Sequence, residues 1–214
     1  MFKKIIYSFA ALLFSFQFSV AQKPVGHAEQ ILSELISNTK TTAIKTNFRL
    51  IVSERTNPEK YISSGTITLK GNKFFLETNE MKAWFNGKTQ WAYSPQSNEV
   101  SVTEPTEKEW AQTNPIAILA GFKSKSTIRF SDKAKATQNY VIEMTPKPRN
   151  KVVEQIEVQI NKSTGNLVSL KLINKNGSVT SVTLNNFQKG ISVNDNMFVY
   201  NTEKHKGVVI NDLR

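Results

Sequence analysis

The feature that most constrains this chain is a period-two alternation of apolar and polar residues that recurs along most of its length. Side chains of an extended strand point alternately to its two faces, so each alternating run predicts a half-buried strand. The runs contain Phe48-Leu50-Val52, Ile67-Leu69, Val100-Val102, Tyr140-Ile142-Met144, Ile156-Val158-Ile160, Val168-Leu170-Leu172 and Val182-Leu184. Their number predicts one large sheet as the main structural element.

Short turn sequences separate several of these runs. Asn86-Gly87, Thr164-Gly165-Asn166 and Asn176-Gly177 combine residues that tolerate positive φ, as tight connections between antiparallel strands require. We therefore expect an antiparallel meander of roughly ten strands, which must curl or close at that width.

Two segments have helical patterns instead. Between residues 27 and 39, apolar residues recur three and four positions apart, at Ala28, Ile31, Leu32, Leu35 and Ile36. This spacing predicts an amphipathic N-terminal helix. A shorter apolar helix is predicted after Asn114, which can serve as N-cap, with Pro115 in its first turn and Gly121 at its end.

The apolar face of such a sheet needs a cover, and the two helices are the candidates for it. The predicted fold class is mainly β (α+β). A curled antiparallel sheet forms an incomplete, half-open β-barrel, covered by the N-terminal amphipathic helix and the short apolar lid helix. The pattern leaves open whether the interior is packed solid or holds an apolar guest.

The first 21 residues have the layout of a secretory signal peptide. Lys3 and Lys4 precede an apolar stretch over residues 5–18, and Ser19-Val20-Ala21 precedes Gln22. The apolar stretch is shorter than the roughly 20 residues that a membrane-spanning helix needs. We expect cleavage after Ala21, a periplasmic location, and one monomeric domain over residues 22–214.

The formal charge is +11, and loss of Lys3 and Lys4 with the leader leaves +9. The cations are spread along the chain instead of forming one block, so nucleic acid is not the expected partner. The densest clusters are Lys123, Lys125 and Arg129, and Lys147, Arg149 and Lys151. They are either solvated surfaces or a docking patch for an anionic partner.

The sequence shows no pattern typical of catalysis or of metal binding. Cysteine is absent, and His27 and His205 do not form a metal-ligand pair. No Gly-x-Ser-x-Gly or Gly-x-Gly-x-x-Gly run occurs. We therefore expect no catalytic residue, no metal and no cofactor, and a function other than that of an enzyme.

A central block of the chain resembles the outer-membrane lipoprotein carrier family. The block runs from Gly65-Thr66-Ile67-Thr68-Leu69-Lys70 through Phe74-Phe75-Leu76 to Asn86–Pro95 and Glu99–Val102. Its most specific part is Lys88-Thr89-Gln90-Trp91-Ala92-Tyr93-Ser94-Pro95. Asn114–Leu119 resembles the short lid helix of the family, and Tyr140–Lys147 resembles its next strand.

Two positions differ from the family pattern. Gly71-Asn72 stands where the family often has an arginine and a proline, and that arginine helps to hold the lid helices closed. The trigger of cargo release is therefore not evident in this chain. Asn86 replaces the usual aspartate, and both residues suit a turn.

The resemblance implies a soluble periplasmic carrier that binds the acyl chains of lipoproteins in an apolar cavity. It would receive acylated lipoproteins from an inner-membrane lipoprotein-releasing transporter and pass them to an outer-membrane acceptor. The absence of cysteine favours this carrier over the membrane-anchored receptor of the same family.

The predicted lipid-binding cavity takes side chains from the sheet and from both helices. They are Phe48, Leu50, Ile67, Leu69, Phe75, Trp91 and Tyr93 from the sheet, with Leu32, Leu35, Ile116 and Leu119 from the helices. The alternatives are an ordinary closed core, an exported binding protein for other lipids or apolar ligands, and a surface or structural protein without a ligand. An undetected hydrolase is the most distant of them.

Overall fold

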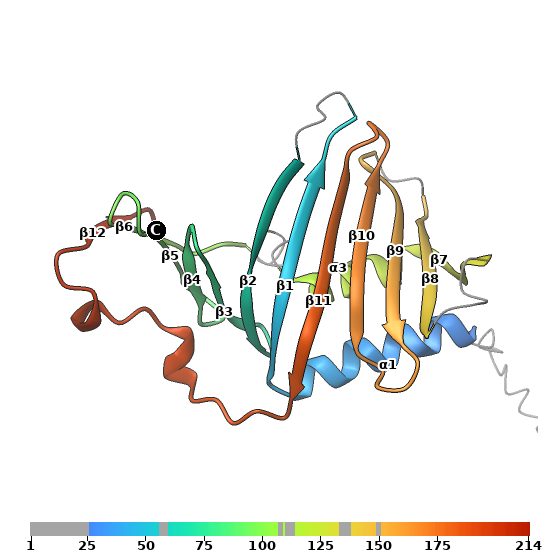
Figure 1. Ribbon diagram of the computed structural model, residues 1–214, viewed down its shortest axis with the longest axis horizontal. Helices are drawn as coiled ribbons and strands as arrows, with labels where there is room; N and C mark the ends of the chain where they lie inside the picture. The colour runs from blue at the N-terminus through green and yellow to red at the C-terminus, as the bar shows by residue number, and fades with distance from the viewer. Residues whose placement is uncertain (1–25, 56–59, 107–108, 110–113, 133–137, 149–150) are drawn as a thin grey trace, which may run out of the picture.

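The protein folds around one wide, open β-sheet. The computed structural model describes residues 26–55, 60–106, 109, 114–132, 138–148 and 151–214, so the expected signal peptide over residues 1–21 lies outside the described residues. Within the described part the chain is mainly β, with a 12-stranded sheet and two α-helices (Figure 1). The sheet does not close into a barrel, as the half-open prediction required.

The strands follow the alternating runs of the sequence. They are β1 (Ile44–Ser53), β2 (Lys60–Lys70), β3 (Lys73–Thr78), β4 (Lys82–Phe85), β5 (Gln90–Ser94), β6 (Glu99–Thr103), β7 (Ser126–Phe130), β8 (Asn139–Pro146), β9 (Val153–Asn161), β10 (Leu167–Asn174), β11 (Val179–Lys189) and β12 (Val209–Asp212). Every pair is antiparallel except β12 with β6, which is parallel.

Two meanders make up the sheet. Its order is β12-β6-β5-β4-β3-β2-β1-β11-β10-β9-β8-β7, so β1 to β6 form one half, β7 to β11 form the other, and the long β1–β11 pair joins them. The predicted turns are confirmed, because Gly87, Gly165 and Gly177 all have positive φ.

One strand departs from the simple alternation that its sequence predicts. The register of β10 shifts between Leu167 and Ser169, which marks a bulge. Leu167 and Leu170 are consequently both buried, whereas Val168 is only half-buried. The predicted inward series Val168-Leu170-Leu172 is therefore wrong at its first member.

Both predicted helices are present. α1 (His27–Thr41) buries Ala28, Leu32, Leu35 and Ile36, which are members of the predicted apolar stripe. α3 (Pro115–Lys123) begins at Asn114, whose Oδ1 accepts from the backbone N of Ile116 at 2.9 Å. It continues through Gly121, so the predicted end at that glycine is wrong.

After β11 the chain runs along the sheet to its far edge (Figure 1). We call residues 191–212 the strap. It contains the short 3-10 helices η2 (Asp195–Phe198) and η3 (Thr202–Lys204) and ends in the edge strand β12. None of the described helices is long and apolar enough to span a membrane.

Candidate functional site

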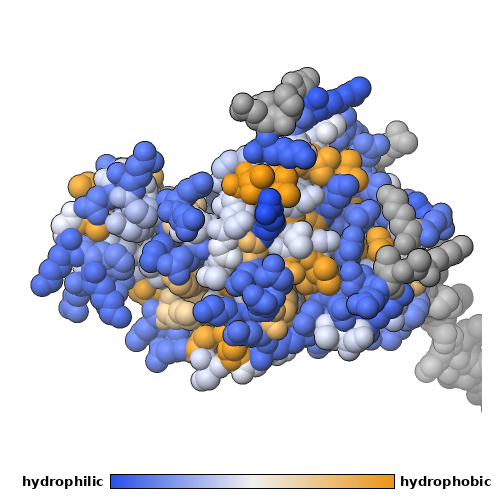
Figure 2. Space-filling model, viewed as in Figure 1, coloured by the Kyte–Doolittle hydropathy of each residue, from blue (hydrophilic) through white to orange (hydrophobic). Residues whose placement is uncertain are grey.

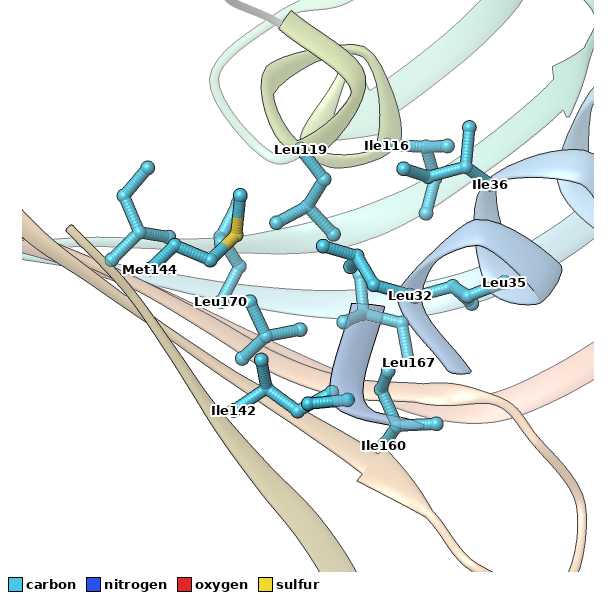
Figure 3. Packing of buried hydrophobic residues seen from close by; sticks show 13 residues of the cluster. Leu32, Leu35, Ile36, Ile116, Leu119, Ile142, Met144, Ile160, Leu167 and Leu170 are labelled. Carbon is cyan, nitrogen blue, oxygen red and sulfur yellow. The ribbon is translucent and has the colours of Figure 1, made fainter. Parts of the chain in front are cut away.

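The two helices pack on the inner face of the β7–β11 half of the sheet. Leu32, Leu35 and Ile36 of α1 and Ile116 and Leu119 of α3 point toward one another and toward the strands (Figure 3). The strands contribute Ile142, Met144, Ile156, Val158, Ile160, Leu167 and Leu170. Leu32, Leu119, Ile142 and Met144 are fully buried. This inner core cluster is a packed hydrophobic core.

A second apolar cluster lies on the inner face of the other half of the sheet. The β1–β4 cluster contains Ile67, Leu69, Phe74, Ala83 and Phe85, with Phe48 and Leu76 at its margin. Leu69 lies directly opposite Phe74, which in turn lies opposite Phe85, so these three side chains share one face. The rings of Phe74 and Phe85 are 5.5 Å apart.

A cavity of about 280 Å³ lies between α1, α3 and the β2–β3 hairpin. Its apolar walls come from Leu69 of the β1–β4 cluster and from Ile116, Ala117 and Ala120 of α3. Ile116 also belongs to the inner core cluster. The cavity therefore lies where the two apolar clusters of the inner face meet.

The other residues around this cavity are Gly71 and the polar residues Thr39, Lys40, Asn72 and Asn114. The hydroxyl of Thr39 donates to the carbonyl oxygens of Leu35 and Ile36, and Asn114 caps α3. Lys40 is exposed and has no ion-pair partner among the described residues. An apolar cavity with one cation at its edge can accept a hydrocarbon chain that carries a polar or anionic head.

The structure brings eight of the eleven predicted cavity residues to the inner face. Leu32, Leu35, Ile116 and Leu119 are in the inner core cluster, and Phe48, Ile67 and Leu69 are in the β1–β4 cluster. Leu50 is half-buried two residues along β1 from Phe48, on the same face. Of these eight, Leu69 and Ile116 line the cavity itself.

The other three predicted residues, Phe75, Trp91 and Tyr93, lie on the opposite face of the sheet. Phe75 is opposite Trp84, and Trp84 is opposite Trp91, whereas the neighbouring Phe74 faces inward. On β5 the residues of the inner face are Gln90, Ala92 and Ser94. The prediction placed these aromatic residues in one cavity with Leu69, and the alternation of strand faces separates them from it.

These outer residues form an aromatic cluster under the strap. The outer aromatic cluster buries Trp84, Val100 and Tyr200, with Phe75, Trp91, Tyr93 and Val208 packed around them. The ring of Tyr200 is 5.2 Å from that of Trp84 and stacks on His205 at 4.7 Å. Burial raises the pKa of Tyr200, whose hydroxyl has no hydrogen-bond partner among the described residues.

An ionic contact holds the strap against the β2–β3 hairpin. Asp195 of η2 receives hydrogen bonds from the ammonium groups of Lys70 at 2.7 Å and Lys73 at 2.6 Å. These two bonds lower the pKa of Asp195 from 3.8 to about 2. Phe198, at the end of the same short helix, is fully buried.

The prediction missed four inward residues, Phe74, Phe85, Ala117 and Ala120. Phe74 was recognisable, because a two-residue Gly71-Asn72 turn sets Leu69 directly opposite Phe74. The small residues Ala117 and Ala120, one helical turn apart, leave room beside α3. Their sequence pattern is that of any apolar helix, so the sequence does not indicate that a cavity lies beside them.

A second, more polar pocket of about 230 Å³ lies beside α1. It is lined by His27, Gln30, Ile31, Glu34, Leu35, Asn38, Tyr140, Ile160, Asn161, Lys162 and Gly165. No group of three or more histidine, aspartate or glutamate side chains suited to a metal ion occurs in the described part of the chain.

A solved structure with low sequence identity has a similar fold, and others align less closely. An uncharacterised conserved protein from Thermus thermophilus is 10% identical and has a TM-score of 0.56, over 87% of this chain and 99% of that one. A LolA superfamily protein from Nitrosomonas europaea is 12% identical, with a TM-score of 0.42 over 81% of this chain and 97% of that one. No curated protein sequence matches the chain.

The sequence itself matches a known family over more than half of its length. The family described as outer membrane lipoprotein carrier protein LolA matches residues 40–178, which include β1 to β10 and α3. This match confirms the resemblance that the central block predicted. The chain therefore belongs to the outer membrane lipoprotein carrier (LolA) family.

Proposed function

We propose that this protein is a periplasmic carrier that binds the acyl chains of lipoproteins and takes them from the inner to the outer membrane. The supporting observation is the cavity beside Leu69 and Ile116, where the two apolar clusters of the inner face meet. Each buried CH₂ group of a guest contributes about 0.8 kcal/mol, so affinity rises with every carbon that the apolar walls cover. The partners are an inner-membrane lipoprotein-releasing transporter and an outer-membrane acceptor.

The cavity must widen before the protein can bind the acyl chains of a lipoprotein. A volume of about 280 Å³ lies just below the usual range of small-molecule pockets, so it does not hold three long acyl chains. The β1–β4 cluster and the inner core cluster are separate groups on either side of the cavity. Outward movement of α1 and α3 as a lid would widen the cavity, at the cost of contacts that these helices make with the strands in the inner core cluster.

The same cavity favours a second candidate, an exported carrier of single-chain lipids. A single chain needs less widening, and exposed Lys40 at the cavity offers a cation to an anionic head group. The two candidates differ in cargo, and both use the apolar walls formed by Leu69, Ile116, Ala117 and Ala120.

Filling the cavity tests both candidates. The double variant Ala117→Phe/Ala120→Phe places two rings in the cavity. Exclusion of even two CH₂ groups of a guest costs about 1.6 kcal/mol, which is more than tenfold in affinity. Titration with a triacylated lipopeptide and with a free fatty acid should show this loss.

The control is Ala92→Phe, a single substitution of the same type at a half-buried alanine of β5 outside the cavity lining. It should bind like the wild type. Unchanged affinity in the double variant would contradict the cavity assignment. Wild-type binding of the fatty acid alone would favour the single-chain carrier over the lipoprotein carrier.

The cellular role is tested by depletion of the protein followed by membrane fractionation. A lipoprotein carrier predicts that lipoproteins accumulate in the inner membrane. Normal sorting in depleted cells would exclude the lipoprotein role and leave the single-chain carrier as the better proposal.

A further inference from the structure

Four of the eight exposed large apolar residues in the described part of the chain lie toward the end of the sheet where β2 begins, the upper end in Figure 1; the other four lie in the strap and just after it. Tyr61 and Ile62 at the start of β2 are 53% and 46% exposed. Met81 before β4 is 37% exposed, and Val152 before β9 is 63% exposed. Figure 2 shows apolar surface at this end, surrounded by hydrophilic side chains. We call these four residues and the cations around them the upper-rim surface.

Hydrogen bonds join neighbouring parts of the upper-rim surface in each half of the sheet. The hydroxyl of Tyr61 donates to Glu80 Oε2 at 3.2 Å, which joins β2 to the β3–β4 turn. The backbone N of Lys175 donates to the carbonyl of Val152 at 3.0 Å, which joins the β10–β11 turn to the loop before β9. Each bond therefore holds two neighbouring parts of the upper-rim surface together.

Among the described residues of this surface, cations outnumber carboxylates. The exposed cations are Arg55, Lys60, Lys125, Lys147, Lys151 and Lys175, and the exposed carboxylates are Glu54, Glu80 and Glu154. None of the six cations makes an ion pair with another described residue. Their charge is available to an external anion.

From this arrangement we infer that the upper-rim surface docks on an anionic lipid bilayer. Apolar side chains enter the head-group region, where a tyrosine ring is also favoured, while the ammonium groups of long lysine side chains reach the phosphates. The apolar residues are spaced along loop tips and strand ends, and both cavities lie elsewhere. Such spacing suits a fluid interface better than a partner with a complementary shape.

Docking by this surface is separate from guest binding. The candidate cavity lies beside the end of α1 and the β2–β3 turn, at Lys40, Gly71 and Asn72, which is the opposite end of the sheet (Figure 1). The bound protein would therefore hold the cavity away from the bilayer. The inference consequently stands whether or not the proposed function is correct.

Vesicle co-sedimentation tests the inference directly. The wild type should bind vesicles of equal parts phosphatidylglycerol and phosphatidylcholine and should bind pure phosphatidylcholine vesicles weakly. Lys147→Glu/Lys151→Glu/Lys175→Glu should lower the affinity for the anionic vesicles about tenfold or more, because each cation near the surface contributes to binding. Ile62→Ser/Val152→Ser should also lower it, by removing the apolar contact.

The matched control reverses three exposed lysines elsewhere, Lys45→Glu/Lys204→Glu/Lys206→Glu, and has the same net charge as the first variant. It should keep most of the wild-type affinity. All substituted residues are exposed, and equal melting temperatures would verify that each variant folds. Equal loss in the control would overturn the inference, since binding would then follow net charge alone. Absence of wild-type binding to the anionic vesicles would overturn it too.

Discussion

The β7–β11 half of the sheet and the strands β5 and β6 bury their apolar side chains on opposite faces. In β7 to β11 the inner face carries the apolar residues, and α1 and α3 pack on it. In β5 and β6 the inner face is mostly polar, with Gln90 and Ser101, while Trp91 and Val100 face outward beneath the strap. A strand therefore buries the face on which another segment packs. In this molecule the helices pack on the inner face and the strap packs on the outer face.

The helices on the inner face and the strap on the outer face are also connected differently to the rest of the fold. α3 is followed by β7 to β11, so displacement of α3 disturbs a whole half of the sheet. Within the described residues, no strand after β11 lies between two other strands. The strap can therefore detach without unfolding the remainder, and we expect core and strap variants to behave differently.

The largest effect is expected from Leu119→Ala. Leu119 is fully buried between α3 and the strands, so its truncation leaves a cavity and costs about 3 kcal/mol of the free energy of unfolding. Urea unfolding followed by circular dichroism should show one transition at a lower midpoint. A cost below about 1 kcal/mol would mean that α3 is not coupled to the sheet as the structure indicates.

Much of this fold was predictable from local patterns. Strand alternation, turn glycines and the Asn114 cap are signals that nearby residues carry, and the structure confirms them. The face that a strand buries is decided by distant segments. Phe75 and Trp91 were predicted to face the cavity, because the sequence of β3 to β5 contains no sign of the strap that covers them.

The cavity was only partly predictable for a related reason. Leu69 and Ile116 were identified as apolar residues on the inner face, and they do line it. Whether apolar residues enclose a space or fill it depends on the distance between α3 and the β2–β3 hairpin, and no residue type encodes that distance. Leu32 and Leu119 were predicted on the same grounds and are packed in the core.

A smaller effect is expected from Phe198→Ala, which removes the fully buried anchor of the strap. If the strap detaches separately, the loss of stability cannot exceed the free energy of strap docking, so it should be smaller than the cost of about 3 kcal/mol that truncation of a buried phenylalanine has in a cooperative core. Emission of Trp84 and Trp91 should shift to the red while circular dichroism stays nearly unchanged. The measurement uses a Trp110→Phe background, because the chain has three tryptophans.

Phe198→Ala also has an outcome that would reverse the comparison. If Phe198→Ala lowers the midpoint of the whole unfolding transition as much as Leu119→Ala does, the strap is part of the cooperative core. The helices and the strap would then contribute to stability in the same way and differ only in their position along the chain.

The smallest effect is expected from Asp195→Asn. The pKa of Asp195 is lowered to about 2, so its ionised form stabilises the docked strap above its ordinary pKa of 3.8, and this contribution is lost as the pH falls through about 2. The pair is exposed, so the loss at neutral pH should be slight and should shrink further in high salt. Tryptophan emission of the variant and the wild type should differ near pH 6 and converge near pH 2. A difference that persists at the acid end would show that Asp195 holds the strap by its shape and not by its charge.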